Sequence, residues 1–283
     1  MPASSRREFM KNTGAAGILA AGMSGLRANP LGLPIGCQTW PVREMIKKDF
    51  PGTIKVLAGD GFQMVELCSP WGYADSGFKG LQKYKPAELK KILNDNGVGC
   101  ISSHYGIGEL RKNLAERIEW AKAMSMTQMM VPSLSGPKTP TMDDVKKAAA
   151  EYSKMGEQTA KAGIQLGLHN EDFELTTVNG ERTYDLLLGL MDPQAVKYQF
   201  QVSTISAGYD AADYFMKYPG RFISMHVQGW SKETKKEVAV GQGSLDWKKI
   251  FTAAKTGGIQ NYFVEMDLPL MAASVPYLKS LTV

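Results

Sequence analysis

The chain has 283 residues, of which 43% are hydrophobic and 22% are charged, and it carries no acidic or basic tail. The apolar content is enough for a sizeable core. The formal net charge is +5, but residues 1–28 hold four basic residues and one acidic residue, so the rest of the chain carries only about +2. This charge is too small to indicate binding to nucleic acid or to an anionic membrane.

The first 28 residues are predicted to be an export signal rather than part of the fold. Residues 5–11 read SRREFMK, which matches the twin-arginine pattern of paired arginines followed by an aromatic residue and a lysine. The mildly apolar stretch that follows, TGAAGILAAGMSGL, is too short and too weakly hydrophobic to span a bilayer stably. We therefore expect export by the twin-arginine pathway, cleavage near Ala28, and a periplasmic protein without a membrane span. The alternative is an N-terminal helix with a basic start.

Beyond residue 32, short apolar runs alternate with stretches whose apolar residues recur every three or four positions. These stretches predict helices, and several end at a glycine just before the next run, a common signal for a helix end. Eight runs predict strands: 33–40, 62–68, 98–105, 127–134, 164–171, 196–205, 222–230 and 261–267. Such alternation predicts a parallel sheet, and its eight units predict one (β/α)8 TIM barrel domain over residues 29–283. A doubly wound open sheet is the alternative.

In such a barrel, the carboxyl ends of the strands and the loops after them form the active site. The three histidines of the chain, His104, His169 and His226, each end an apolar run. Carboxylates and amides end other runs, and a carboxylate is costly to bury without a partner, which a divalent cation would provide. The side chains expected to meet at this end are those of Gln38, Trp40, Glu66, His104, His169, Glu171, Glu174, Gln201, His226, Gln228, Glu265 and Asp267.

Four segments resemble the xylose isomerase-like TIM barrels, the sugar phosphate isomerase/epimerase superfamily that also includes endonuclease IV. They are LGLHNEDFE at 166–174, YPGRFISMHVQGW at 218–230, GQGSLDW at 241–247 and FVEMD at 263–267. The resemblance covers roughly residues 33–280. It implies a (β/α)8 barrel that isomerises or epimerises a sugar.

The resemblance also implies a divalent metal (Mn, Mg, Co or Zn) whose ligands in this sequence would be Glu174, Gln201, His226 and Glu265. Gln201 stands where the family carries an aspartate, and an amide oxygen brings no charge, so we expect weaker metal binding. Glu171 replaces the second histidine of the family's His-Asn-His stretch, and it either compensates for the lost aspartate or points outward. Glu174 and Glu265 would be the acid/base pair that moves a proton next to a carbonyl.

Five further residues are predicted to contact the substrate. His104 is expected to hydrogen-bond it, with a buried core histidine as the alternative. His169 is expected to orient a ligand or to touch the substrate. Glu66 is either part of the polar lining or a catalytic residue. Trp40 and Trp230 lie on a predicted aromatic rim, which suits the apolar faces of a carbohydrate but is also common as ordinary packing.

The leading functional hypothesis is a metal-dependent isomerase or epimerase of an unphosphorylated sugar or keto-sugar, because no phosphate-cradling glycine loop or arginine cluster is evident. One alternative is a lyase that cleaves a keto-glycoside by β-elimination at the same site. The other is a non-catalytic sugar-binding barrel with a degenerate metal site, which Gln201 favours. Three histidines are too few for a three-zinc endonuclease site, so we expect no nucleic-acid substrate. The oligomeric state is left open.

Overall fold

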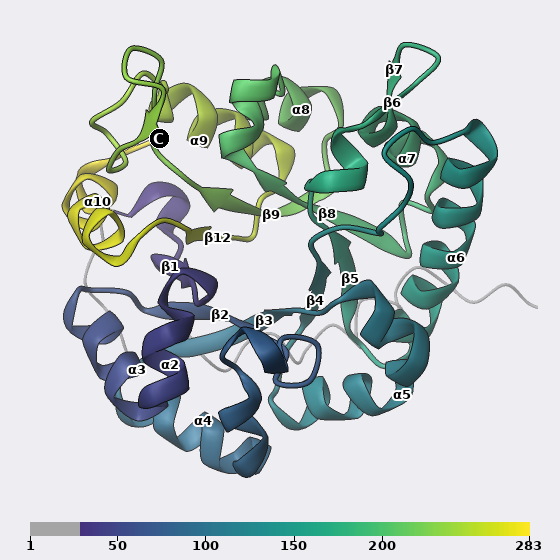
Figure 1. Cartoon of the computed structure of the whole chain (residues 1–283). Helices are drawn as coiled ribbons and strands as arrows, with labels where there is room; N and C mark the ends of the chain where they lie inside the picture. The colour runs from purple at the N-terminus through teal and green to yellow at the C-terminus, as the bar shows by residue number, and fades with distance from the viewer. Residues whose placement is uncertain (1–28) are drawn as a thin grey trace, which may run out of the picture.

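A computed structural model describes residues 29–283, and its centre is a closed barrel of eight parallel strands (Figure 1). The spatial order of the strands is β1-β12-β9-β8-β5-β4-β3-β2. Their bounds are β1 (Gly36–Gln38), β2 (Met64–Cys68), β3 (Gly99–His104), β4 (Gln128–Val131), β5 (Gln165–Leu168), β8 (Val196–Gln201), β9 (Phe222–Val227) and β12 (Asn261–Val264). Each strand lies inside one of the eight predicted runs, so the predicted (β/α)8 TIM barrel is confirmed. The predicted export signal, residues 1–28, lies outside the described residues.

Helices surround the ring of strands on its outer side (Figure 1). Helix α6 shows why they form: the side chain of Thr141 caps its first turn, and a buried stripe that includes Val145, Ala149 and Tyr152 faces the barrel. None of the helices within residues 29–283 is long and apolar enough to cross a membrane. The helices are α2 (Arg43–Lys48), α3 (Phe50–Gly59), α4 (Pro86–Asp95), α5 (Ile107–Ala123), α6 (Met142–Lys161), α7 (Thr183–Leu190), α8 (Ala211–Lys217), α9 (Trp247–Gly257) and α10 (Leu268–Ser280).

Two short hairpins and several 3-10 turns extend the loops at the carboxyl end of the barrel. The hairpin β10–β11 (Trp230–Ser231 and Lys236–Glu237) follows strand β9, and the hairpin β6–β7 (Thr177–Val178 and Glu181–Arg182) follows the turn η5 (Asp172–Leu175). A second turn, η2 (Trp40–Val42), follows strand β1. These loops carry side chains to positions above the strand ends.

The interior of the barrel is unusually polar for a buried core. Strand register places Gln38 beside Glu66, Glu66 beside Ser102, and Ser102 beside Gln128, so that polar side chains form one layer across four neighbouring strands. All four side chains are buried. Buried polar groups are stable only when they are hydrogen-bonded, and the partners of this layer are described with the site below.

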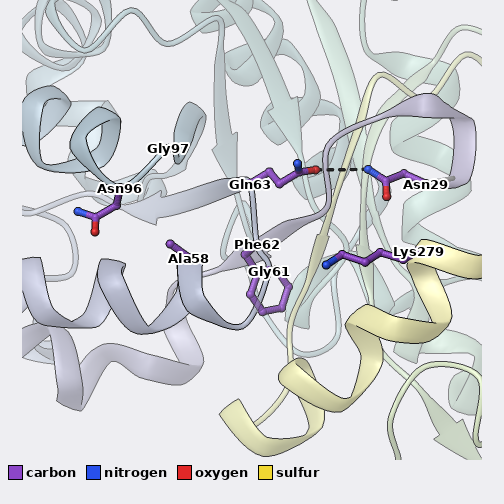
Figure 2. A pocket seen from close by; sticks show the side chains of 8 residues that line it. All are labelled: Asn29, Ala58, Gly61, Phe62, Gln63, Asn96, Gly97 and Lys279. Atoms are coloured by element: carbon purple, nitrogen blue, oxygen red, sulfur yellow. Dashed lines mark hydrogen bonds between the residues drawn. The ribbon is translucent and has the colours of Figure 1, made fainter. Parts of the chain in front are cut away.

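A cavity of about 490 Å³ lies at the opposite, amino-terminal end of the barrel (Figure 2). Figure 2 shows the side chains of Asn29 and Gln63 joined by a hydrogen bond of 3.3 Å, with Lys279 extending from helix α10. The remaining lining comes from the end of helix α3 and from the loops before strands β2 and β3. The lining of this cavity contains no histidine and no carboxylate.

Candidate active site

A cavity of about 330 Å³ opens at the carboxyl end of the barrel, where the strand pattern predicted the active site. It is lined by Trp40, Pro41, Arg43, Glu171, Gln201, Gln228, Glu237, Glu265, Met266 and Asp267. Three of the predicted site residues, Trp40, Gln201 and Glu265, are therefore part of its wall. Four carboxylates and two amides dominate this lining, and they come from loops far apart in the sequence.

Glu66 is fully buried, and its carboxylate gathers the polar side chains of the barrel interior. Oε1 accepts hydrogen bonds from the hydroxyl of Ser102 at 2.5 Å and from the amide of Gln199 at 2.9 Å. Oε2 accepts from the amide of Gln38 at 2.7 Å and lies 2.6 Å from Nε2 of His226. Burial acts to raise the pKa of Glu66, but the adjacent histidines outweigh it and hold this pKa well below its ordinary value. Glu66 is thus an ionised anchor beneath the cavity.

His226 lies between two carboxylates. Its Nε2 faces Glu66, and its Nδ1 lies 2.8 Å from Oε2 of Glu265. Burial acts to lower the pKa of His226, but its interactions with Glu265 and Glu66 outweigh that effect and raise this pKa to about 10. An imidazole that donates from both nitrogens carries a positive charge and has no lone pair free for a metal. A metal at His226 would therefore have to displace one of these carboxylates.

Glu265 follows strand β12 and forms the boundary between the buried histidines and the cavity. Its Oε2 also accepts a hydrogen bond of 2.7 Å from the amide nitrogen of Gln201. Burial acts to raise the pKa of Glu265, but His226 outweighs it and the pKa is lowered overall. Because Gln201 directs its nitrogen to Glu265, its carbonyl oxygen Oε1 is left buried without a hydrogen-bond partner among the described residues.

The other two histidines lie close to His226 in the barrel. His104 and His226 stack with their ring centroids 5.1 Å apart, and His169 lies 4.5 Å from His226 by the same measure. Nε2 of His104 contacts the amide oxygen of Gln199 at 2.8 Å. Both ring nitrogens of His169 are buried without a hydrogen-bond partner among the described residues. The three histidines offer ligand atoms within 4.8 Å of one another, so this triad is able to hold a metal ion.

Glu174, the predicted partner of Glu265, faces a neighbouring loop. Its Oε1 accepts a hydrogen bond of 2.9 Å from the backbone nitrogen of Leu134, which follows strand β4. Burial raises the pKa of Glu174 to about 8. Glu171 lines the cavity and Glu174 does not. The backbone of Asp172 between them adopts a left-handed φ of 40°, which is uncommon for a residue other than glycine. The catalytic and ligand roles of Glu174 stay predictions.

Among the predicted aromatic contacts, Trp40 lines the cavity, whereas Trp230 lies on strand β10 opposite Glu237 of strand β11. Two lining residues escaped the sequence analysis, Arg43 and Glu237. Glu237 belongs to a segment rich in lysine and glutamate that resembles a solvated loop, and only the hairpin brings it to the cavity. Arg43 begins helix α2, where a basic residue carries no signal of its own.

The chain matches the family model described as xylose isomerase-like TIM barrel over residues 54–279, and it belongs to this family. The family resemblance deduced from the sequence motifs is therefore confirmed. No curated protein matches the sequence.

Solved structures share the fold at low sequence identity. A sugar phosphate isomerase/epimerase from Parabacteroides distasonis is 23% identical, with a TM-score of 0.75 over 87% of this chain and 93% of that one. A D-psicose 3-epimerase determined in the presence of D-fructose is 14% identical, with a TM-score of 0.63 over 87% and 96%. The IOLI protein with a bound zinc atom is 11% identical, with a TM-score of 0.65 over 88% and 95%. At these identities the comparisons establish the fold.

Proposed function

We propose that this protein is a sugar isomerase or epimerase that moves a proton at a carbon next to a carbonyl group. Family membership and the sugar-converting neighbours support this class. The observation that carries the proposal is the carboxylate of Glu265, which is held by His226 and Gln201 at the wall of an open polar cavity. A carboxylate that is fixed by two neighbours and kept ionised is suited to act as a general base.

In this proposal Glu265 removes the proton, and the electrons of the broken C–H bond move onto the carbonyl oxygen. A second carboxylate returns a proton, and we assign this step to Glu171 because it lines the same cavity. Strands β5 and β12, which precede these two residues, are separated in the barrel by β8 and β9, so the carboxylates approach a ligand from different sides. Burial, followed by repulsion from Glu265, raises the pKa of Glu171, which favours its role as the acid.

A divalent metal such as Mn, Mg, Co or Zn fits this site by the chemistry of its donors. The nitrogens of His169 and the Oε1 of Gln201 are buried without partners, and a cation would satisfy them. His104, His226 and Glu265 are further donors, and imidazole with oxygen ligands suits several of these ions. When bound, such an ion would polarise the carbonyl group of the substrate. Titration calorimetry with MnCl₂ tests this independently of turnover, with His169→Ala expected to weaken binding at least about tenfold.

The reaction is tested by nuclear magnetic resonance in D₂O with D-fructose and D-psicose, with each metal added in turn. We expect deuterium to enter at the carbon next to the carbonyl and one sugar to convert into the other. Glu171→Gln should remove the conversion while leaving exchange from one of the two sugars, because Glu265 still serves one face. Glu174→Gln is the matched comparison and should keep both. Activity lost in Glu174→Gln but retained in Glu171→Gln would return the role to Glu174.

A non-catalytic sugar-binding barrel is the second candidate, favoured by the neutral Gln201 next to Glu265. It predicts binding of the sugar without deuterium exchange, together with less than about a tenth of an equivalent of divalent metal that added Mn or Zn does not restore. The keto-glycoside lyase predicts instead that a 3-keto-glycoside releases its leaving group. The same spectra distinguish these outcomes.

We also propose that the protein is exported to the periplasm by the twin-arginine pathway. The support is the SRREFMK segment at residues 5–11. Replacing Arg6 and Arg7 by lysine should abolish the periplasmic fraction, and N-terminal sequencing of the exported protein should locate the cleavage near Ala28. An uncleaved wild-type protein in the cytoplasm would contradict this.

A further inference from the structure

The wall of the carboxyl-end cavity is rich in groups that accept hydrogen bonds and poor in groups that donate them. Its four carboxylates are those of Glu171, Glu237, Glu265 and Asp267. His226 compensates the charge of Glu265 from below the cavity. Among the described ion pairs, neither Glu237 nor Asp267 has a cationic partner, and Glu171 lies 3.6 Å from a nitrogen of His169. Burial and the interactions with His226 and His104 lower the pKa of His169 well below its ordinary value, so this ring is neutral.

The two amides of the wall add to this imbalance. The nitrogen of Gln201 donates to Glu265, and the nitrogen of Gln228 donates to Glu237. Each amide therefore uses a donor on a carboxylate. The carbonyl oxygen of Gln201 is the strongest sign of an incomplete site, because the residue is only 6% exposed, lines the cavity and leaves this oxygen without a partner. A buried acceptor of this kind requires a donor from a ligand.

One cation, Arg43, belongs to the wall. Its guanidinium lies 4.5 Å from the centre of the Trp40 ring and donates through Nη1 to the backbone oxygen of Trp40 at 3.0 Å. Part of its donor capacity is therefore used within the protein. Against one such cation, three carboxylates have no cationic side chain paired with them. Burial, followed by repulsion from nearby carboxylates, raises the pKa of Glu171 and of Glu237, as expected where like charges converge.

From this excess of acceptors and negative charge we propose that the cavity selects its ligand by charge, and that its preferred ligand is an amino sugar. An ammonium group brings three donors and one positive charge, which the carboxylates and the Gln201 oxygen complement. A neutral sugar supplies donors through its hydroxyl groups but no charge. A phosphate or carboxylate group brings only acceptors and further negative charge, so phosphorylated and acidic sugars are disfavoured. This inference deepens the proposed function and rests on it.

The test compares three sugars of one skeleton by titration calorimetry with the protein as purified: 1-amino-1-deoxy-D-fructose, D-fructose and D-fructose 6-phosphate. We expect the amino sugar to bind at least about tenfold more tightly than D-fructose, and the phosphate to bind at least about tenfold more weakly. The preference should shrink as salt is raised from low ionic strength, because the rim carboxylates are solvent-accessible.

A pair of double variants separates local charge from net charge. E237Q/D267N removes two carboxylates of the cavity and should reduce the preference for the amino sugar to about threefold or less. E157Q/D143N removes two exposed carboxylates of helix α6 and should leave the preference intact.

Equal affinities for the three sugars, tightest binding of the phosphate, or an equal effect of the two double variants would each overturn the inference. In those cases the proposed function stands if D-fructose still exchanges deuterium. If none of the three sugars binds, both the inference and the proposed sugar-converting function fail.

Discussion

The two ends of the barrel carry cavities of opposite character. The cavity at the amino-terminal end is the larger, about 490 Å³ against about 330 Å³ at the carboxyl end. Its polar side chains are matched with each other or exposed, as when Asn29 donates to Gln63. At the carboxyl end, carboxylates converge and buried polar atoms of Gln201 and His169 lack partners among the described residues.

This difference teaches that volume alone does not mark the functional site. Folding normally pairs every buried polar atom, so buried atoms without partners at one end of the barrel indicate groups that await a ligand. The polar atoms that line the amino-terminal cavity include none of the unpartnered buried atoms found in residues 29–283. The experiments below pair a change at the carboxyl end with one at the amino end where the chain allows it.

The largest effect is expected for Glu265→Gln. Loss of the general base should lower kcat by on the order of 10³- to 10⁴-fold, while the circular dichroism spectrum and the Tm stay close to those of the wild type. Deuterium exchange into D-fructose is the measurement. The matched change at the other end is Lys279→Ala, which should leave kcat and KM unchanged. Comparable losses in both variants would refute the assignment of the site to the carboxyl end.

Next in size is the effect of Glu66→Ala on stability. This change removes the acceptor of Gln38, Ser102 and Gln199 and leaves His226 with one carboxylate, so we expect a loss of about 3–5 kcal/mol in the free energy of unfolding. Gln63→Ala at the amino-terminal cavity should cost about 1 kcal/mol or less. Urea denaturation measures both. A loss below that of Gln63→Ala would contradict the anchoring role of Glu66.

The pH dependence of stability should reveal the buried carboxyl group of Glu174. Its pKa is about 8 in the folded protein and near 4.5 when unfolded, so between these values the folded state binds more protons. This contribution is fully present below pH 4.5 and is lost as the pH rises through 8. Glu174→Gln keeps the acceptor for Leu134 and removes the titration. The variant should therefore gain about 2–4 kcal/mol relative to the wild type at pH 8 compared with pH 5. A constant difference across this range would count against a buried, protonated Glu174.

The smallest effect is expected at the rim. Trp40→Ala removes a ring that lines the cavity and supports Arg43, so KM should rise about five- to tenfold with kcat nearly unchanged. Trp230→Ala is the comparison, since Trp230 is not among the lining residues, and it should change KM by less than about twofold. Equal rises in KM would show that both rings contact the sugar.

Much of the fold was predictable because it depends on local periodicity. Each apolar run from 33–40 to 261–267 contains one observed strand, and Gly258 ends helix α9 with the left-handed φ of 89° that a glycine allows. Local patterns also predicted that His226 and Glu265 would meet, because both follow the alternation of neighbouring parallel strands.

The details of the site were less predictable. Loop side chains are directed by turns that sequence spacing does not determine, and the left-handed Asp172 between Glu171 and Glu174 is one of them. Glu237 reaches the cavity only because strand β11 pairs with strand β10. The opposed directions of the Gln201 nitrogen and oxygen follow from the position of Glu265 on a distant strand.

The sequence by itself determined the barrel, its family and the end of the barrel at which its histidines and carboxylates gather, since these follow from strand period and from the topology of parallel sheets. Only the tertiary structure decided which carboxylates share the cavity and which buried atoms lack partners. Those choices depend on contacts between segments up to 160 residues apart, as between Glu66 and His226, and such contacts exist only when the barrel is closed.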